Sequence, residues 1–347
     1  MSVLKFLTGF LVLFSMACAT SSHEEKNKEA QQEVNVYSHR FYDADRLLYQ
    51  KFEEKTGIKV NIKEDEADKL IALLQSEGEN TQADVLITVD AGRLYYAKEL
   101  GLSQAVNSEI LNNNVPEYLR DADQHWFGLT KRARVILYNT ENVTREELST
   151  YEDLTNDIWK GQIFVRSGSN IYNQSLLASI ISRRGEEMAL KWAKGIVANM
   201  AREPKGNDRD QIKEMAAGNG KIAIANSYYL GKLLNSENEM EKKAGSHVGI
   251  FFPNQDSYGT HINISGGFVT KFAPNKENAV ALLEFLTSVE AQNAFSESNF
   301  EYPVNRDANI SELLQSWGSF KEDNLNVSEL GLYNAKAIEI FKMAAWN

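Results

Sequence analysis

The chain of 347 residues has one cysteine, Cys18, and five histidines. A single cysteine excludes an intrachain disulfide, a thiolate metal cluster and a CxxC redox pair. No HExxH, paired HxH or His/Cys spacing indicates a zinc site. A P-loop, a dinucleotide fingerprint and a GxSxG elbow are also missing, since the nearest approach to an elbow, GSHVG at residues 245–249, has histidine at its centre. We therefore expect a binding protein and not an enzyme.

Basic residues are fewer than acidic ones, 37 against 48, which gives a formal net charge of -11. This balance argues against nucleic acid as a partner, because phosphate binding needs clustered Lys and Arg. Hydrophobic residues make up 43% of the chain, enough for a sizeable core. At about 150 residues per domain, the length predicts two domains.

Long apolar runs are missing except near the N-terminus. Residues 6–17 form a mostly apolar stretch that is too short to span a bilayer and is typical of an export signal. Cys18 follows Ser15, Met16 and Ala17, which resembles a lipobox and would place a lipid anchor at Cys18; cleavage after an A-x-A-like site would instead remove the cysteine. We assign residues 1–18 to this signal and the polar residues 19–32 to a flexible tether.

From residue 34 onward the pattern alternates between strands and helices. Such alternation predicts an α/β fold with parallel strands and right-handed crossovers. Asp43 or Asp45 is expected to cap the first helix and Gly57 to end it, whereas Asn170 is expected to open a later one. Strands are expected at residues 34–37, 58–62, 84–89, 127–138, 162–165, 221–225, 248–252 and 261–270, and the main helices near 43–57, 66–75, 90 onward, 170 onward, 186–200, 207–217, 227 onward, 275–286 and 289–295.

Two of these β segments, residues 127–138 and 261–270, lie between the two α/β units. We interpret them as crossovers between two lobes, one built from residues 33–131 plus 260–305 and the other from 132–259 plus 306–347. The alternative is a single large mixed sheet.

Tyrosines follow apolar runs at three of the expected strand-to-helix junctions. They are Tyr42, Tyr172 and the pair Tyr228 and Tyr229. In an open α/β sheet such junctions line one crevice at the carboxyl ends of the strands. Adjacent residues on a helix point about 100° apart, so both rings of a pair can reach one ion only where the helix begins. The competing explanations are an aromatic pair packed on the sheet, a surface tyrosine and an ordinary polar loop.

Phenol oxygens indicate which ion such a crevice would select. A free tyrosine has a pKa of about 10, so a cation must displace the proton to bind. Phenolate is a hard anionic donor that suits Fe(III), and three phenolates balance a 3+ charge in a crevice. The tyrosines therefore predict a ferric-iron site whose affinity falls as the pH drops.

Twelve segments spread along the chain match one known family: VYSHRFYDAD, TGIKVNI, ADVLITVD, VPEYLR, WFGLTKRARVILYN, LSTYEDL, SNIYNQS, AREPKGND, ANSYYLGKLL, FFPNQ, GTHINISGG and EYPV. Through these segments the chain resembles the periplasmic ferric-ion-binding proteins of bacterial iron ABC importers, in their tyrosine-rich branch. The resemblance implies a type II periplasmic-binding-protein fold of two lobes that close on Fe(III). It also implies a location in the periplasm or cell envelope and delivery of the iron to a membrane permease with its ATPase. We expect a monomer that touches the membrane only through a lipid anchor.

Tyr172, Tyr228 and Tyr229 match the family's second-lobe ligands, and Tyr42 matches its first-lobe tyrosine. The family often has histidine just before that tyrosine, where this chain has Phe41; His39, two residues earlier, is a possible substitute because residues two apart on a strand share a face. The candidates for a synergistic anion or for supporting the ligands are Arg40, Arg132, Arg134 and Arg202.

Two other functions fit the same fold. One is binding of an organic or anionic solute such as a polyamine, a carboxylate or a phosphonate, with the tyrosines stacking on the ligand. The other is an enzyme or sensor domain that passes ligand state to a membrane kinase.

Overall fold

All the strands expected from the sequence form within residues 32–347, the part of the chain that the computed structural model describes. The predicted signal at residues 1–18 and all but the last residue of the tether lie outside the described residues. The strands are β1 (Glu33–Ser38), β2 (Lys59–Glu64), β3 (Val85–Val89), β4 (Phe127–Asn139), β5 (Ile163–Phe164), β6 (Ile222–Asn226), β7 (Val248–Phe251) and β8 (Ile262–Val269).

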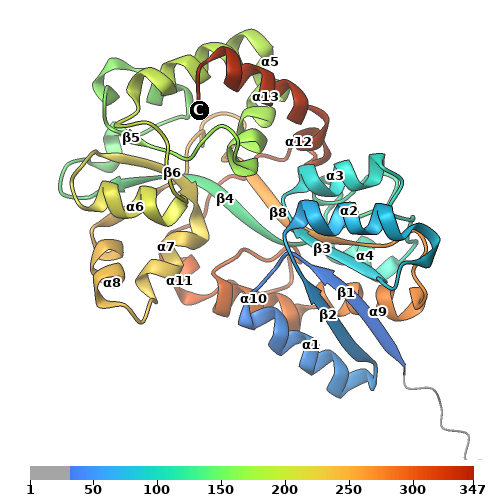
Figure 1. The fold of residues 1–347 in the computed structure, drawn as a ribbon. Coiled ribbons are helices and arrows are strands. Elements are labelled where there is room, and N and C mark those ends of the chain that lie inside the picture. Colours follow the sequence, from blue (N-terminus) through green and yellow to red (C-terminus); the bar gives the residue numbers. More distant parts are fainter. Residues whose placement is uncertain (1–31) are drawn as a thin grey trace, which may run out of the picture. The chain divides into compact units, whose positions relative to one another are not determined.

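The sheet has the order β2-β1-β3-β8-β4-β6-β5, with β7 beside β4 (Figure 1). β1 pairs in parallel with β2 and β3, as the alternating pattern predicted. β8 runs antiparallel to both β3 and β4. The mixed α/β fold class is therefore confirmed.

Helices cover the sheet. Those within the described residues are α1 (Asp43–Thr56), α2 (Ala67–Glu77), α3 (Ala91–Glu99), α4 (Glu109–Asn114), α5 (Ile171–Asn199), α6 (Asp208–Ala216), α7 (Ser227–Leu234), α8 (Glu239–Ser246), α9 (Lys276–Leu286), α10 (Val289–Asn299), α11 (Glu312–Ser316), α12 (Ser328–Leu332) and α13 (Asn334–Met343). Short 3-10 helices are Gly78–Asn80, Glu117–Leu119, Arg145–Glu147, Glu152–Thr155 and Asp157–Trp159. None of the helices in this part of the chain has the length and apolar character needed to cross a membrane.

Helix ends follow the expected signals with one exception. Gly57 ends α1 in the left-handed conformation, with φ 73°, and the side chain of Asn170 caps α5 by accepting from the Tyr172 amide. The prediction that Asp43 or Asp45 caps α1 is wrong, because Tyr42 holds the cap position and makes no side-chain capping bond. Asp45 instead turns toward the guanidinium of Arg40.

The long strand β4 links two parts of the sheet. Its first half, from Phe127 to Ala133, pairs with β8, and its second half, from Arg134 to Asn139, pairs with β6 and β7. The change of partner occurs within one residue, so a single strand carries the chain from one side of the sheet to the other. This is the crossover expected for residues 127–138.

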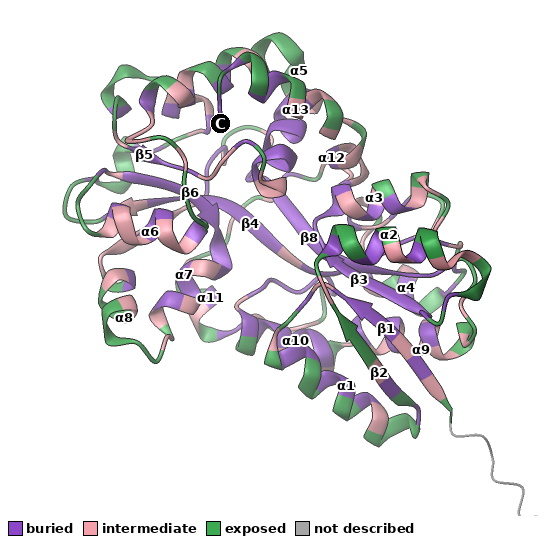
Figure 2. Cartoon of the chain, viewed as in Figure 1, coloured by how far each residue is buried: buried purple, intermediate pink, exposed green. Residues whose placement is uncertain are grey.

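The strands at the centre of the sheet are buried along their whole length. Every residue of β3 and of β8 is buried, as expected for strands covered by helices on both faces (Figure 2). Gly266 allows this packing, because a side chain there would overlap the Phe127 carbonyl and the Leu94 methyl group. The larger hydrophobic cluster includes residues of β1 and β3 as well as β6 and α7, so the predicted lobe boundaries remain a prediction.

Candidate functional site

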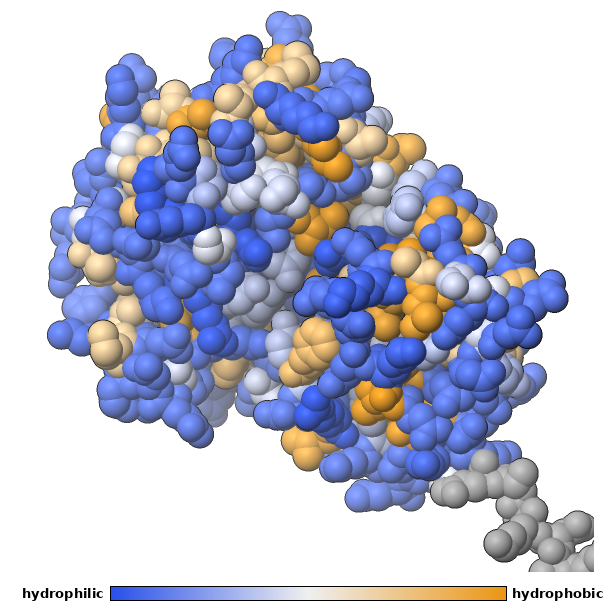
Figure 3. Space-filling view, in the orientation of Figure 1, coloured by the Kyte–Doolittle hydropathy of each residue, from blue (hydrophilic) through white to orange (hydrophobic). Residues whose placement is uncertain are grey.

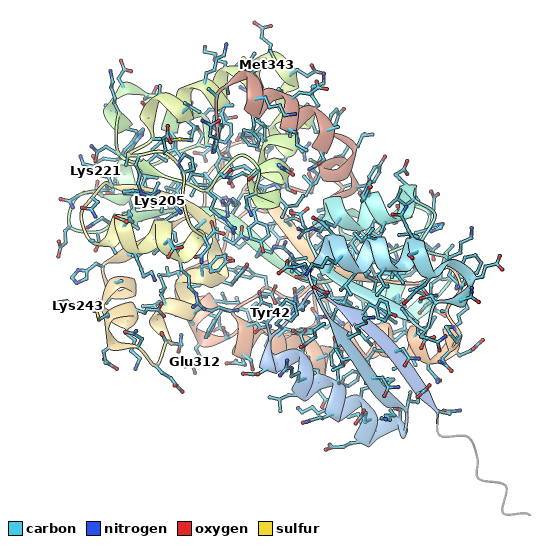
Figure 4. All side chains as sticks on the ribbon, viewed as in Figure 1. Tyr42, Lys205, Lys221, Lys243, Glu312 and Met343 are labelled. Carbon is cyan, nitrogen blue, oxygen red and sulfur yellow. The ribbon has the colours of Figure 1, made fainter. Side chains whose placement is uncertain are left out.

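The four tyrosines singled out from the sequence lie at or just inside helix starts. Tyr42 immediately precedes α1, Tyr172 is the second residue of α5, and Tyr228 and Tyr229 are the second and third residues of α7. α1 and α7 each follow a buried strand end, so their first turns are held at the edge of the sheet. Figure 4 labels Tyr42 where α1 begins, near the centre of the view where the strands cross.

Three of the phenols are joined by direct contacts. The hydroxyl groups of Tyr228 and Tyr172 lie 3.5 Å apart, and the rings of Tyr228 and Tyr229 have centroids 4.3 Å apart at an interplanar angle of 33°. A tilted pair of rings at this distance is possible because both residues lie in the first turn of α7. The structure therefore brings Tyr172 and the Tyr228–Tyr229 pair together from two helices.

Lys232 lies between the ring of Tyr42 and that of Tyr228. The Lys232 Nζ atom lies 3.6 Å from the centroid of the Tyr42 ring and 5.4 Å from that of Tyr228. Lys232 is one helical turn after Tyr228 on α7, so the two side chains share a face. The surface is indented between the side that carries α6 to α8 and the side that carries α1 (Figure 3).

The ring of Tyr172 is surrounded by guanidinium groups. Arg132, Arg134 and Arg166 place their Cζ atoms 5.6, 5.9 and 5.6 Å from its centroid. Arg132 donates to Ser265 at 3.3 Å, yet its Nη2 atom, which is buried, has no hydrogen-bond partner among the described residues. Buried donors are normally paired, so an unpaired guanidinium donor beside the phenols suits a bound anion.

Arg134 and Arg40 are held by acidic or amide groups. Arg134 donates to Asp208 at 3.0 Å and to Asn173 at 2.7 Å. Arg40 lies between Asp45 at 2.9 Å and Glu301 at 3.0 Å and stacks 5.1 Å from the Tyr42 ring. Arg40 is therefore paired with two carboxylates and lies against the Tyr42 ring.

Arg202 and His39 lie apart from the phenols. Arg202 stacks 5.1 Å from the Phe164 ring and donates to Gln211 at 3.3 Å. The His39 Nε2 atom lies 3.4 Å from Glu66, and its ring makes an edge contact with Phe41 at 5.9 Å. Burial and the nearby Arg93 lower the pKa of His39. Among the described residues, no hydrogen bond, ion pair or ring contact joins either side chain to the four tyrosines.

Burial controls the protonation of the phenols. Burial raises the pKa of Tyr42, and the Glu301 carboxylate raises it further against the opposing effect of Arg40. Burial also raises the pKa of Tyr228 and Tyr229, with a second contribution from Tyr172. Burial lowers the pKa of Lys232 to about 8, although Glu301 opposes that change. These three tyrosines are thus neutral phenols near pH 7 in the metal-free protein.

Lys232, Arg166, Asp208 and Glu301 belong to the site but were not predicted from the sequence. Lys232 had a usable signal, because it follows Tyr228 by four residues on an expected helix. Asp208 and Glu301 reach the site only through tertiary folding. Within residues 32–347, no three His, Cys, Asp or Glu side chains gather as a metal site built from such ligands would require.

The sequence profile of the bacterial extracellular solute-binding proteins matches residues 80–321. The chain belongs to this family. It is 51% identical over 316 residues to iron uptake protein A1 of Synechocystis, covering 91% of this chain and 88% of that protein. The major ferric iron-binding protein of Neisseria meningitidis is 26% identical over 280 residues, covering 79% of this chain and 81% of that protein.

Solved structures of extracellular solute-binding proteins have the same fold. A Trichodesmium protein, IdiA or FutA, in complex with iron and citrate ligands has a TM-score of 0.89 and 53% identity, covering 91% of this chain and all of that one. The predicted relationship to ferric-ion-binding proteins and the type II two-lobed fold are thereby confirmed. Membership of a solute-binding family also agrees with the expectation that the chain is not an enzyme.

Proposed function

We propose that this solute-binding protein carries ferric iron, held by the phenolates of Tyr42, Tyr172, Tyr228 and Tyr229. The observation that carries the proposal is the convergence of four phenols from three separate helix starts on one place. Aromatic packing alone would not require hydroxyl groups, nor would it gather guanidinium groups around one of the rings. The names of the relatives, which bind ferric iron or take up iron, support the same cargo.

The chemistry of the donors supports a hard trivalent cation. Phenolate oxygen is a hard anionic ligand, and soft thiolate ligands are excluded because Cys18 is the only cysteine. The His39 imidazole already pairs with Glu66, so the proposed ligand set consists of phenols. Each neutral phenol must lose its proton to the solvent when the cation binds.

An anion bound with the iron is part of the proposal. The unpaired Nη2 atom of Arg132 and the unpaired Nε atom of Arg134 are buried beside Tyr172. A small carboxylate anion would pair with these donors and fill the remaining positions on the iron. Arg40 has no such role here, because its guanidinium group is held by Asp45 and Glu301. Arg202 also has a buried Nε atom without a partner among the described residues, but its guanidinium group stacks on Phe164 and not on Tyr172.

The transport role follows from the family. We propose that residues 33–131 with 260–305 and residues 132–259 with 306–347 are lobes that close on the iron. The change of partner along β4, between Ala133 and Arg134, supports a division there. The loaded monomer would then deliver iron to an ABC permease and its ATPase from the periplasm or cell envelope, with Cys18 as a lipid anchor.

Addition of ferric citrate to chelator-treated protein tests the cargo. A visible phenolate-to-iron charge-transfer band that saturates at one iron per chain is the expected result. Gallium(III) citrate should occupy the same site without a visible band and should block the iron-dependent band. If neither metal bound, and native mass spectrometry instead found an organic or phosphonate solute in the purified protein, the proposal would be wrong.

A further inference from the structure

Asp90, at the carboxyl end of β3, has an unusual backbone conformation. Its φ is 82° and its ψ is 124°, in a region that residues with a Cβ atom rarely adopt. Such strain persists only where the surrounding structure fixes the residue in place, and it often marks a functional position. The Asp90 side chain is fully buried although it carries a carboxylate.

Three partners hold the Asp90 carboxylate, and two of them come from α3 and β8. The Gly92 amide donates at 2.9 Å and the Asn263 side-chain amide donates at 2.8 Å. Asn263 is itself fixed, because its side-chain oxygen accepts from the Ala91 amide at 3.0 Å and from the Ile264 amide at 2.8 Å. The carboxylate is thus held rigidly by β3, β8 and the first turn of α3.

The third partner, Ser175, comes from α5. Its hydroxyl group lies 2.8 Å from each of the two Asp90 oxygens, and the side chain is fully buried. Ser175 follows Tyr172 by three residues on the first turns of α5, so the two side chains lie on neighbouring positions of one helix face. The bond therefore ties the helix that carries Tyr172 to the end of β3, on the other side of the crossover.

We propose that the Ser175–Asp90 hydrogen bond is a latch that keeps the two sides of the molecule closed around the iron and slows its release. The inference rests on the proposed function and names two residues that set the residence time of the cargo. A hydrogen bond to a carboxylate is about twice as strong as a neutral one and is lost as soon as its partners separate. The backbone of Asp90 and its bonds to Gly92 and Asn263 fix the carboxylate at the position where the Ser175 hydroxyl binds it.

The test compares Ser175→Ala with Ser179→Ala. Ser179 lies one turn further along α5 and is also buried, but its hydroxyl donates at 2.7 Å to the Leu176 carbonyl of its own helix. Both variants remove one buried hydroxyl group from the same helix. Only Ser175→Ala also removes the hydrogen bond to Asp90. Asp90→Asn is the second variant, since it keeps the shape of the acceptor and removes its charge.

Iron-loaded proteins are mixed with excess EDTA, and the decay of the charge-transfer band gives the release rate. Ser175→Ala should release iron on the order of ten to a hundred times faster than the wild type, and Asp90→Asn should also release it faster. Association with ferric citrate should change less than about twofold, because variants of one binding site usually differ much more in release rate than in association rate. Ser179→Ala should behave as the wild type, and equal release rates for Ser175→Ala and Ser179→Ala would overturn the latch.

A metal-free readout separates the latch from the cargo. If the wild type failed to bind ferric citrate, the proposed function would fail, and the latch would be judged by hydrogen exchange in the first turns of α5. Ser175→Ala should then exchange faster there than Ser179→Ala at similar melting temperatures. Equal exchange in the two variants would overturn the latch independently of the iron.

Discussion

Two pairs of adjacent tyrosines, Tyr228–Tyr229 and Tyr95–Tyr96, occupy helices that each begin at a strand end. The first pair lies at the second and third positions of α7, whereas the second lies at the fifth and sixth positions of α3. Tyr228 is only 4% exposed, but Tyr96 is 55% exposed. The same dipeptide is therefore placed in different surroundings by its distance from the helix start.

The geometry of the helix explains the difference. Successive residues project about 100° apart, so deep in a helix one of two neighbours must face away from any common point. Tyr95 packs its ring against Gly331 of α12, and Tyr96 points to solvent. At the first turn of α7 the two rings instead lie against each other, with centroids 4.3 Å apart. A tyrosine pair thus indicates a shared ligand site only where it opens a helix.

Replacing both tyrosines of each pair by phenylalanine gives the largest contrast. Removal of a residue that hydrogen-bonds to a metal ligand typically lowers metal affinity about 10- to 100-fold. Removal of a ligand itself should cost at least about 100-fold, so Tyr228→Phe with Tyr229→Phe should lower ferric affinity about 10,000-fold. Tyr95→Phe with Tyr96→Phe should leave ferric affinity within about twofold. Competition with citrate, followed by the charge-transfer band, measures both. Full affinity in the Tyr228–Tyr229 variant would remove these residues from the site.

The pH dependence of iron binding sharpens the same comparison. Burial raises the pKa of Tyr42, Tyr228 and Tyr229, so each is protonated below that raised value and must release a proton when iron binds. Affinity should therefore fall as the pH is lowered from 8 to 6, by about tenfold per pH unit for each proton released. In the Tyr228→Phe, Tyr229→Phe variant two fewer phenols release a proton. Its ferric affinity should therefore change with pH less steeply than that of the wild type, by up to about 100-fold less per pH unit.

The control pair should retain the full dependence. Tyr95→Phe with Tyr96→Phe removes two phenols that do not contact the site, so its slope should equal that of the wild type. Calorimetry in buffers of different ionisation enthalpy gives the number of protons released for each iron that binds. An unchanged slope in the Tyr228–Tyr229 variant would show that other groups supply the protons.

The strands were predictable because their signals are local. Each apolar run of residues such as DVLITV is bounded by polar or turn residues, and Gly57 and Asn170 mark helix ends by their own conformational preferences. The helices α4, α8, α11, α12 and α13 were not predicted. Of these, α11 and α12 have only five residues each, and α12 and α13 pack on α5. The Asp43 or Asp45 cap was wrong because Asp45 has a stronger partner in Arg40.

The four tyrosines could be singled out from the sequence because each has a side chain that can bind a metal and lies just after an expected strand. The four tyrosines follow strand ends, and the crevice rule for α/β sheets brings such positions together. Glu301 lies 261 residues after Arg40, and no local pattern indicates that their side chains form an ion pair at 3.0 Å. The placement of His39 beside Glu66 was equally hidden, because the strand rule fixes a face and not the partner on that face.

The smallest effect should come from Gly331→Ala, which tests the structural side of the comparison. A methyl group at Gly331 would overlap the Cβ and ring atoms of Tyr95, so either Tyr95 or α12 must shift. Overpacking typically costs about 1–3 kcal/mol, and the better helix propensity of alanine returns up to about 1 kcal/mol. We expect a net loss of about 1–2 kcal/mol in urea unfolding, with ferric affinity unchanged. Leu332→Ala, at an exposed position of the same helix, should cost less. Equal stability of the two variants would mean that Tyr95 is not held by α12, and the distinction between a structural and a ligand-binding tyrosine pair would then lose its physical basis.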